Sequence, residues 1–198
     1  MTGKRAAVRE DLTQRLLAAA TARIERHGLA GLRARDITSD AGCGLGTIYK
    51  CFLDLNDLII RVNSRTLARL DVALADAIRG LDSPQEQLQA LAQGYLEFAL
   101  ANLNLWSALF EHRLPDRSDS PKWHLADQEA MFAKVASLLA ALSPALDADQ
   151  LKVRARSVFS AVHGVMSLSL EGRFIGVDKA DLKDELQIIV GALVRGLA

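Results

Sequence analysis

The sequence has little of what marks several common protein classes. Only four of its 198 residues are proline, so long stretches are free to form helices. No run approaches the roughly 18 uninterrupted apolar residues of a membrane-spanning helix. The basic residues 1–9 are not followed by an apolar signal-peptide core. We therefore expect a cytoplasmic protein with no membrane partner.

Cysteine is also scarce, with Cys43 and Cys51 the two in the chain. Neither has a His or Cys at metal-ligand spacing, so we expect reduced, packed thiols and no metal site. A redox-sensing role is the alternative. The sequence shows no Ser/His/Asp order, no phosphate loop and no convincing pair of carboxylates. It therefore gives no catalytic residue and no cofactor.

The formal net charge is zero, but the charges are unevenly distributed along the chain. Residues 1–65 hold 11 Lys and Arg against 7 Asp and Glu, whereas residues 66–198 hold 13 against 17. A basic N-terminal part is typical of a region that meets a polyanion, although an imbalance of four charges is also common on solvated surfaces.

Half of the residues are hydrophobic, and Ala and Leu recur at three-to-four-residue spacing. The sequence therefore predicts an all-α fold of about nine helices. Gly28 and Gly80 follow two of them as stops, and Ser83-Pro84-Gln85-Glu86 has the form of a helix start. The expected helices span residues 11–27, 34–41, 45–52, 56–79, 83–102, 105–110, 120–142, 147–171 and 179–197.

The two helices expected at 34–41 and 45–52 are too short to be stable alone, and only Gly42-Cys43-Gly44 separates them. Two short helices joined by a glycine-containing turn have the form of a helix-turn-helix, whose second helix lies in the major groove of DNA. Gly42 suits a turn position with positive φ. The spacing alone is also found in helical hairpins that never contact DNA.

The buried face of this motif is expected to contain Ile37, Ala41, Ile48 and Phe52. The free face then contains residues suited to a duplex. Gly46 allows close approach, Thr47 offers a hydroxyl and a methyl group to a base edge, and Tyr49 and Lys50 reach phosphates. For Tyr49, packing is the alternative. Leu45 completes this face.

The order of these residues resembles the DNA-binding domain of the TetR family of transcriptional regulators. The resemblance covers about the first 60 residues and rests on the run Ile37-Thr38-Ser39-Asp40-Ala41-Gly42-Cys43-Gly44-Leu45-Gly46-Thr47-Ile48-Tyr49-Lys50-Cys51-Phe52, followed by Asp57-Leu58. The segment Val162-His163-Gly164-Val165-Met166-Ser167-Leu168 is similar to the C-terminal domain of one TetR subgroup.

The resemblance implies a helix-turn-helix domain at residues 1–55 and an effector-binding and dimerisation domain at 56–198. It also implies that Gly46, Thr47, Tyr49 and Lys50 contact DNA. At four positions the chain has residues other than those common in the family: Arg33, Thr38, Gly44 and Leu55. These differences remove some of the phosphate contacts that the resemblance implies. Basic residues could replace them, although the first ones could also be a solvated tail. These residues are Lys4, Arg5, Arg9, Arg33 and Arg35.

Bulky side chains with a few polar tips are concentrated in the C-terminal region, as in small-molecule sites. For any single one of them, ordinary core packing is the alternative. The expected effector-pocket residues are Trp106, Phe110, His112, Trp123, Met131, Phe132, Phe159, His163 and Met166, with His124 beside them.

The last two expected helices have apolar seams suited to helix packing. The resemblance implies that two such helices from each subunit form a homodimer interface, and the alternative is that they complete the monomer core. The expected interface residues are Leu151, Val158, Val162, Val165, Leu182, Leu186, Ile189 and Leu193.

Together these features favour a repressor that binds operator DNA as a homodimer and is released by an apolar or aromatic effector. One alternative is a ligand-free architectural or interaction protein, which would have a solid core in place of a pocket. The other is an enzyme with His112, His124 or His163 as a base, for which the sequence offers no supporting constellation.

Overall fold

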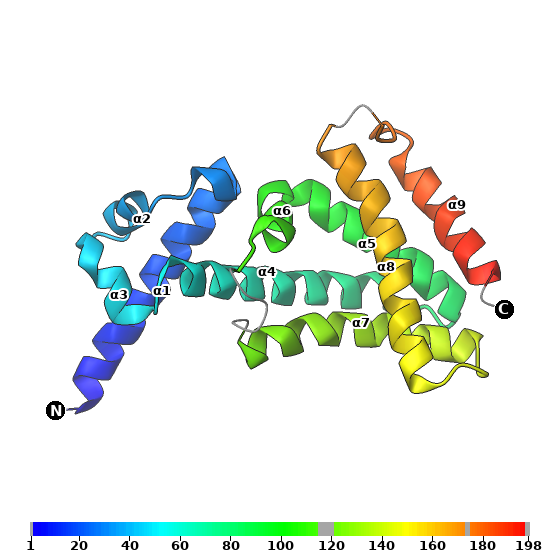
Figure 1. The fold of residues 1–198 in the computed structure, drawn as a ribbon, viewed down its shortest axis with the longest axis horizontal. Coiled ribbons are helices and arrows are strands. Elements are labelled where there is room, and N and C mark those ends of the chain that lie inside the picture. The colour runs from blue at the N-terminus through cyan, green and yellow to red at the C-terminus, as the bar shows by residue number, and fades with distance from the viewer. Residues whose placement is uncertain (1, 115–120, 173–174, 197–198) are drawn as a thin grey trace. The chain divides into compact units, whose positions relative to one another are not determined.

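The computed structural model describes residues 2–114, 121–172 and 175–196, without the side chains of residues 2–4 and 128. These residues form nine α-helices, two short 3-10 helices and no strand, so the all-α fold class is confirmed (Figure 1). The helices are α1 (Thr2–His27), α2 (Ala34–Asp40), α3 (Ile48–Cys51), α4 (Leu55–Ala77), α5 (Pro84–Ala101), α6 (Leu103–Glu111), α7 (Lys122–Leu142), α8 (Ala148–Leu170) and α9 (Leu182–Arg195), with the 3-10 helices η1 (Leu29–Gly31) and η2 (Leu45–Thr47).

The chain divides into two compact units. Unit 1 comprises Met1–Leu67 and Asn102–His124, and unit 2 comprises Ala68–Ala101 and Leu125–Ala198. The helix α4 is continuous across the boundary, because its first residues belong to unit 1 and its last to unit 2. The segment that contains α6 returns to unit 1, where α6 contacts α1 and η1.

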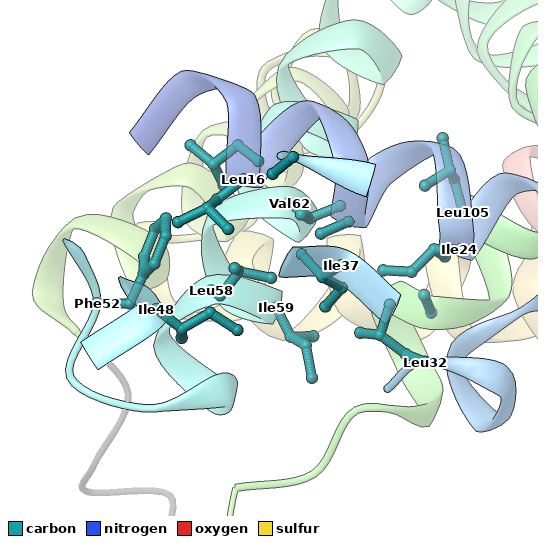
Figure 2. Close-up of a cluster of buried hydrophobic side chains, with 14 residues drawn as sticks. Leu16, Ile24, Leu32, Ile37, Ile48, Phe52, Leu58, Ile59, Val62 and Leu105 are labelled. Atoms are coloured by element: carbon teal, nitrogen blue, oxygen red, sulfur yellow. The ribbon is translucent and has the colours of Figure 1, made fainter. Parts of the chain in front are cut away.

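The core of unit 1 is a cluster of buried aliphatic side chains between the short helices and their supports. Ile37 of α2, Ile48 of α3 and Leu58 of α4 are at most 1% exposed and gather with Leu16 and Ile24 of α1 (Figure 2). Burial of one such side chain contributes roughly 1.5–3 kcal/mol relative to exposure. This core supplies the stability that helices as short as α2 and α3 lack by themselves.

Unit 2 contains α5, α8, α9 and most of α7, with α9 packed against α5 and α8. The apolar seam of α9 is buried here, through Leu182, Leu186, Val190 and Val194. The start of α8 has a complete capping box: the Asp147 side chain accepts from the amide of Gln150 at 2.8 Å, and the Gln150 side chain accepts from the amide of Asp147 at 2.9 Å.

Several expected helix bounds were wrong, including the start of the last helix, which is Leu182 and not residue 179. The first helix begins at Thr2 and not at Asp11, so Arg5 and Arg9 lie on α1 and not in an unstructured tail. Within the missed turns, residues 5–10 are all exposed and carry no apolar stripe, but they contain helix-forming Ala and Arg. The segment expected as a helix from Leu45 begins as the 3-10 helix η2 and becomes α-helical only at Ile48.

Among the described residues, no helix has the length and apolar character needed to cross a membrane.

Candidate functional site

The turn between α2 and α3 has the geometry of a Schellman motif. The amide of Gly42 donates to the carbonyl of Ser39 at 3.1 Å, and that of Cys43 donates to the carbonyl of Thr38 at 2.9 Å. Gly42 has φ of 65°, a conformation that residues with a Cβ adopt at a cost. The turn that the sequence predicted is therefore present, and it fixes the direction of η2 and α3.

The face of η2 and α3 opposite the core is open to solvent. Tyr49 is 66% exposed, and Leu45, Gly46 and Lys50 are also exposed, whereas Thr47 is half-buried. Next to them, Ile48 is 1% exposed. The segment therefore has one face in the core and one free face that presents a small residue, a phenol and an ammonium group together.

The carboxylates of α2 are paired with arginines of α1. Arg23 donates to both oxygens of Asp40, at 2.6 and 2.8 Å, and lies 3.5 Å from Asp36. The hydrogen bond from Arg23 lowers the pKa of Asp40, and the charge of Arg26 acts in the same direction. The negative charge of α2 is thus compensated, which reduces the repulsion that a nearby polyanion would meet.

The end of α3 is held by a cap and an arginine. The Asp54 side chain accepts from the amide of Asp57 at 2.8 Å, and the Asp57 side chain accepts from the amide of Leu53 at 3.0 Å. Arg61 pairs with Asp57 at 2.9 Å, and its guanidinium lies 5.9 Å from the ring of Phe52. The start of α4 therefore fixes the position of the short helix before it.

The other basic residues expected at DNA lie in two places. Arg33 and Arg35 are exposed near the start of α2, where Arg33 donates to the carbonyls of Ala30 and Leu32. Arg5 is exposed on α1. Lys4 belongs to α1 by its backbone, and its side chain lies outside the described residues.

A cavity of about 60 Å³, partly open to solvent, lies within unit 2. Its wall is almost wholly apolar and is formed by Leu74 of α4, Leu88, Leu91, Ala92 and Tyr95 of α5, Met131, Phe132, Lys134 and Val135 of α7, Val158, Phe159 and Val162 of α8, and Val190 of α9.

The polar groups at this cavity are engaged with protein partners. The hydroxyl of Tyr95 lies 3.0 Å from Nδ1 of His163, whose ring stacks on Phe159 with centroids 5.4 Å apart. Burial lowers the pKa of His163, against the weaker opposing influence of Glu171. Lys134 of α7 forms an ion pair with Asp71 of α4. The cavity thus suits a small apolar molecule.

A comparison with protein families decides the class of the chain. The family model described as tetracyclin repressor-like, C-terminal domain, matches residues 88–193, more than half of the sequence. The chain belongs to the TetR family. The resemblance seen in the sequence is thereby confirmed, and the family is one of transcriptional regulators.

Solved structures with the same fold include TetR-family members. A TetR transcriptional regulator from Rhodococcus sp. RHA1 is 17% identical with a TM-score of 0.64, over 96% of this chain and 98% of that one. A protein of unknown function from the same organism is 23% identical with a TM-score of 0.74, over 94% and 95%. RolR in complex with resorcinol is 20% identical with a TM-score of 0.70, over 96% and 89%. No curated protein sequence matches the chain.

The residues expected in the effector pocket of this TetR chain are divided between the units. Trp106, Phe110, His112 and Trp123 belong to unit 1 and do not line the cavity. Trp106 is 1% exposed, and its ring contacts Phe110 with centroids 5.6 Å apart. Of those in unit 2, the cavity brings together Met131, Phe132 and Phe159. His163 reaches it through Tyr95, and Met166 is fully buried.

The residues expected at the dimer interface are also divided. Leu182 and Leu186 are completely buried within unit 2, and Val158 and Val162 line the cavity. The other four residues are partly exposed: Leu151, Val165, Ile189 and Leu193.

Sequence reasoning missed most of the cavity wall. Leu88, Leu91, Ala92 and Tyr95 follow the three-to-four-residue spacing of one helix face, and this stripe was the available signal. The spacing alone does not reveal a cavity, because a cavity wall and a solid core give the same pattern.

The histidines considered as catalytic bases in the enzyme alternative have structural partners. His112 lies 3.1 Å from the amide oxygen of Asn56, and His124 lies 2.9 Å from the hydroxyl of Ser64. Burial lowers the pKa of His112, as does the charge of His124. Within the described part of the chain, no group of three or more His, Cys, Asp or Glu side chains could hold a metal ion.

Proposed function

We propose that this TetR-family protein is a ligand-responsive repressor that acts in the cytoplasm. It binds a palindromic operator as a homodimer and is released by a small apolar or aromatic effector. Residues 1–55 form the DNA-binding domain, and residues 56–198 form the domain that dimerises and takes the effector. The observation that carries the DNA-binding proposal is the free face of η2 and α3, opposite a fully packed core.

The chemistry of that face supports contact with a duplex. Gly46 lets the backbone approach a phosphate or a base, and the half-buried Thr47 offers a hydroxyl and a methyl group. Tyr49 and Lys50 extend furthest from the core and reach phosphates. Leu45 extends the same face, and Arg5, Arg33 and Arg35 are exposed cations that add phosphate contacts, with Lys4 proposed on sequence alone.

The test is the affinity of the full chain for duplexes from the DNA that flanks its own coding region, measured by fluorescence anisotropy at several salt concentrations. We expect Tyr49→Ala and Lys50→Ala each to weaken binding by about tenfold, and Lys50→Ala to reduce the salt slope by about one unit. Lys152→Ala is the matched control, because Lys152 is an exposed lysine of unit 2 that pairs with Asp149. Unchanged affinity in both test variants would place the contact surface elsewhere.

A homodimer supports operator binding because two recognition elements about 34 Å apart can read a palindromic site. In the proposed interface, α8 and α9 contribute the partly exposed Leu151, Val165, Ile189 and Leu193, and α8 adds Val153, which is also exposed. Sedimentation velocity should give a dimer that Val153→Asp and Leu193→Asp together convert to a monomer. A dimer unaffected by this double variant would exclude the interface.

The cavity of unit 2 supports an effector, and RolR, which has a similar fold, is a protein whose structure contains resorcinol. The effector must bind the DNA-incompetent state more tightly, because equal affinity for both states shifts nothing. Movement of α4, which is shared by both units, would change the distance between the recognition helices of the dimer. An operator affinity that no cavity-binding compound alters would favour the ligand-free alternative.

A further inference from the structure

Charge at the cavity of unit 2 is confined to its edge. Lys134 is the one charged residue among those that line it, within the described part of the chain. The wall is apolar, so Lys134 contributes its methylene stem, and its ammonium group is held by Asp71 of α4 through the side chain and, at 3.4 Å, the backbone carbonyl. The cavity thus has an apolar interior and an ion pair at its rim.

A second cation lies close to the same wall. The guanidinium of Arg156 lies 5.9 Å from the ring centroid of Phe132, which lines the cavity. Arg156 is exposed, and in residues 2–114, 121–172 and 175–196 no carboxylate pairs with it. Arg156 is therefore a second cation beside the wall, at Phe132.

The interior of the cavity offers no free hydrogen-bond partner to polar groups of a ligand. The hydroxyl of Tyr95 is already engaged with His163, and the other wall residues of the described chain besides Lys134 are aliphatic, thioether or phenyl groups. A polar group placed among them would lose its hydrogen bonds to water without replacement. A ligand with one polar group must therefore keep that group at the rim.

We propose that the cavity takes an amphipathic monoanion, an alkyl or aryl carboxylic acid whose apolar body enters the cavity while its carboxylate pairs with Lys134 in place of Asp71. This deepens the proposed function, on which it rests, by naming the chemical class of the effector. A carboxylate on Lys134 forms a charge-assisted hydrogen bond, which a neutral ligand of the same shape cannot match.

The exchange of partners is favoured by the exposure of the two side chains. The Asp71 side chain is 44% exposed and that of Lys134 is 30% exposed, so the released aspartate regains water. Asp71 belongs to α4 and Lys134 to α7. Ligand binding thereby breaks an ion pair between these helices, and α4 is the helix that continues into unit 1.

The test uses three probes of nearly equal shape, 4-butylbenzoate, its neutral isostere 4-butylbenzamide and the cation 4-butylbenzylamine. Binding to the full chain is measured by isothermal titration calorimetry. We expect the acid to bind at least about tenfold more tightly than the amide, since a charge-assisted hydrogen bond supplies this factor. The amine should bind more weakly than the amide.

Three variants test whether Lys134 causes the preference for the acid over the amide. Lys134→Met keeps the stem and removes the charge, so it should reduce the preference for the acid below about twofold while amide binding is unchanged. Asp71→Asn removes the competing carboxylate and should strengthen acid binding several-fold. Lys152→Met is the control, because it removes an equivalent ion-paired lysine elsewhere in unit 2. If Lys134→Met fails to fold, Asp71→Asn still tests the exchange.

Equal affinity for acid and amide would overturn the inference, as would a preference that survives Lys134→Met or the absence of binding by any probe at millimolar concentration. Operator affinity is measured in parallel on the ligand-free protein. A protein that binds operator but shows no acid preference loses only this inference. One that binds acids selectively but no duplex loses the proposed function.

Discussion

The two units use amphipathic helices in different ways. In unit 1, α2 has seven residues and α3 has four, and every large apolar side chain on their inner faces is packed. In unit 2, α5 has 18 residues and α8 has 23, and the helices enclose empty space. Helices as short as α2 and α3 depend on tertiary packing for their stability. The face proposed to contact DNA and the cavity proposed to take an effector therefore lie in different units.

The strongest test of this contrast is Leu58→Ala. Leu58 is fully buried in the unit 1 core, and its truncation should lower the free energy of unfolding by about 2–5 kcal/mol. Chemical denaturation measures this loss, and operator affinity should fall with it. The matched control is Leu53→Ala, since Leu53 is 88% exposed and should change stability by less than about 0.5 kcal/mol. Similar losses in both variants would show that the core of unit 1 is not packed as described.

A smaller effect is expected from filling the cavity of unit 2. Ala92 lines the cavity, and Ala92→Leu should weaken 4-butylbenzoate binding by more than about tenfold through occupied space. The free energy of unfolding should stay equal or rise by up to about 1 kcal/mol, because cavity filling adds apolar burial. Ala133→Leu, at an exposed position of α7, is the control that should leave binding unchanged. A large loss of stability in Ala92→Leu would mean that unit 2 is as tightly packed as unit 1.

The smallest expected effect is a pH dependence in unit 2. The folded protein lowers the pKa of His163 through burial, so the unfolded chain binds a proton more readily than the folded one. Stability is then complete above the usual pKa of 6.5 and decreases as the pH falls through the lowered value. We expect thermal unfolding between about pH 8 and pH 5 to show this decrease and His163→Gln to reduce it, with the remainder due to His112, whose pKa is also lowered by burial. A variant with the same pH dependence as the original chain would assign the effect to another group.

Much of the fold could be predicted from the sequence because apolar spacing and stop residues are local signals. Gly28, Gly42 and Gly80 all have positive φ, as their positions after helices indicated. The start of α5 agrees with Ser83, whose hydroxyl accepts from the amide of Glu86 at 3.4 Å. The start of α1 was missed because residues 5–10 are exposed and therefore carry no apolar stripe.

The site was predictable only where it is local. The free face of η2 and α3 followed from spacing and from the order of residues 37–52, and its contacts with DNA stay a prediction. The ion pairs Arg23–Asp40 and Asp71–Lys134 join residues far apart in the sequence, which no periodicity reveals. Trp106 was grouped with the pocket by its size, but the partition of the chain places it in unit 1. Bulk alone does not say which core a side chain joins.

The most direct test of the account is photo-crosslinking to operator DNA. p-Benzoylphenylalanine is placed at position 49, in place of the exposed Tyr49, and in a second protein at position 72, in place of the similarly exposed Val72 of α4 in unit 2. Irradiation with a labelled operator duplex should crosslink the first protein to DNA and leave the second uncrosslinked. Equal crosslinking from both positions, or crosslinking from position 72 alone, would contradict the assignment of the reading surface to η2 and α3.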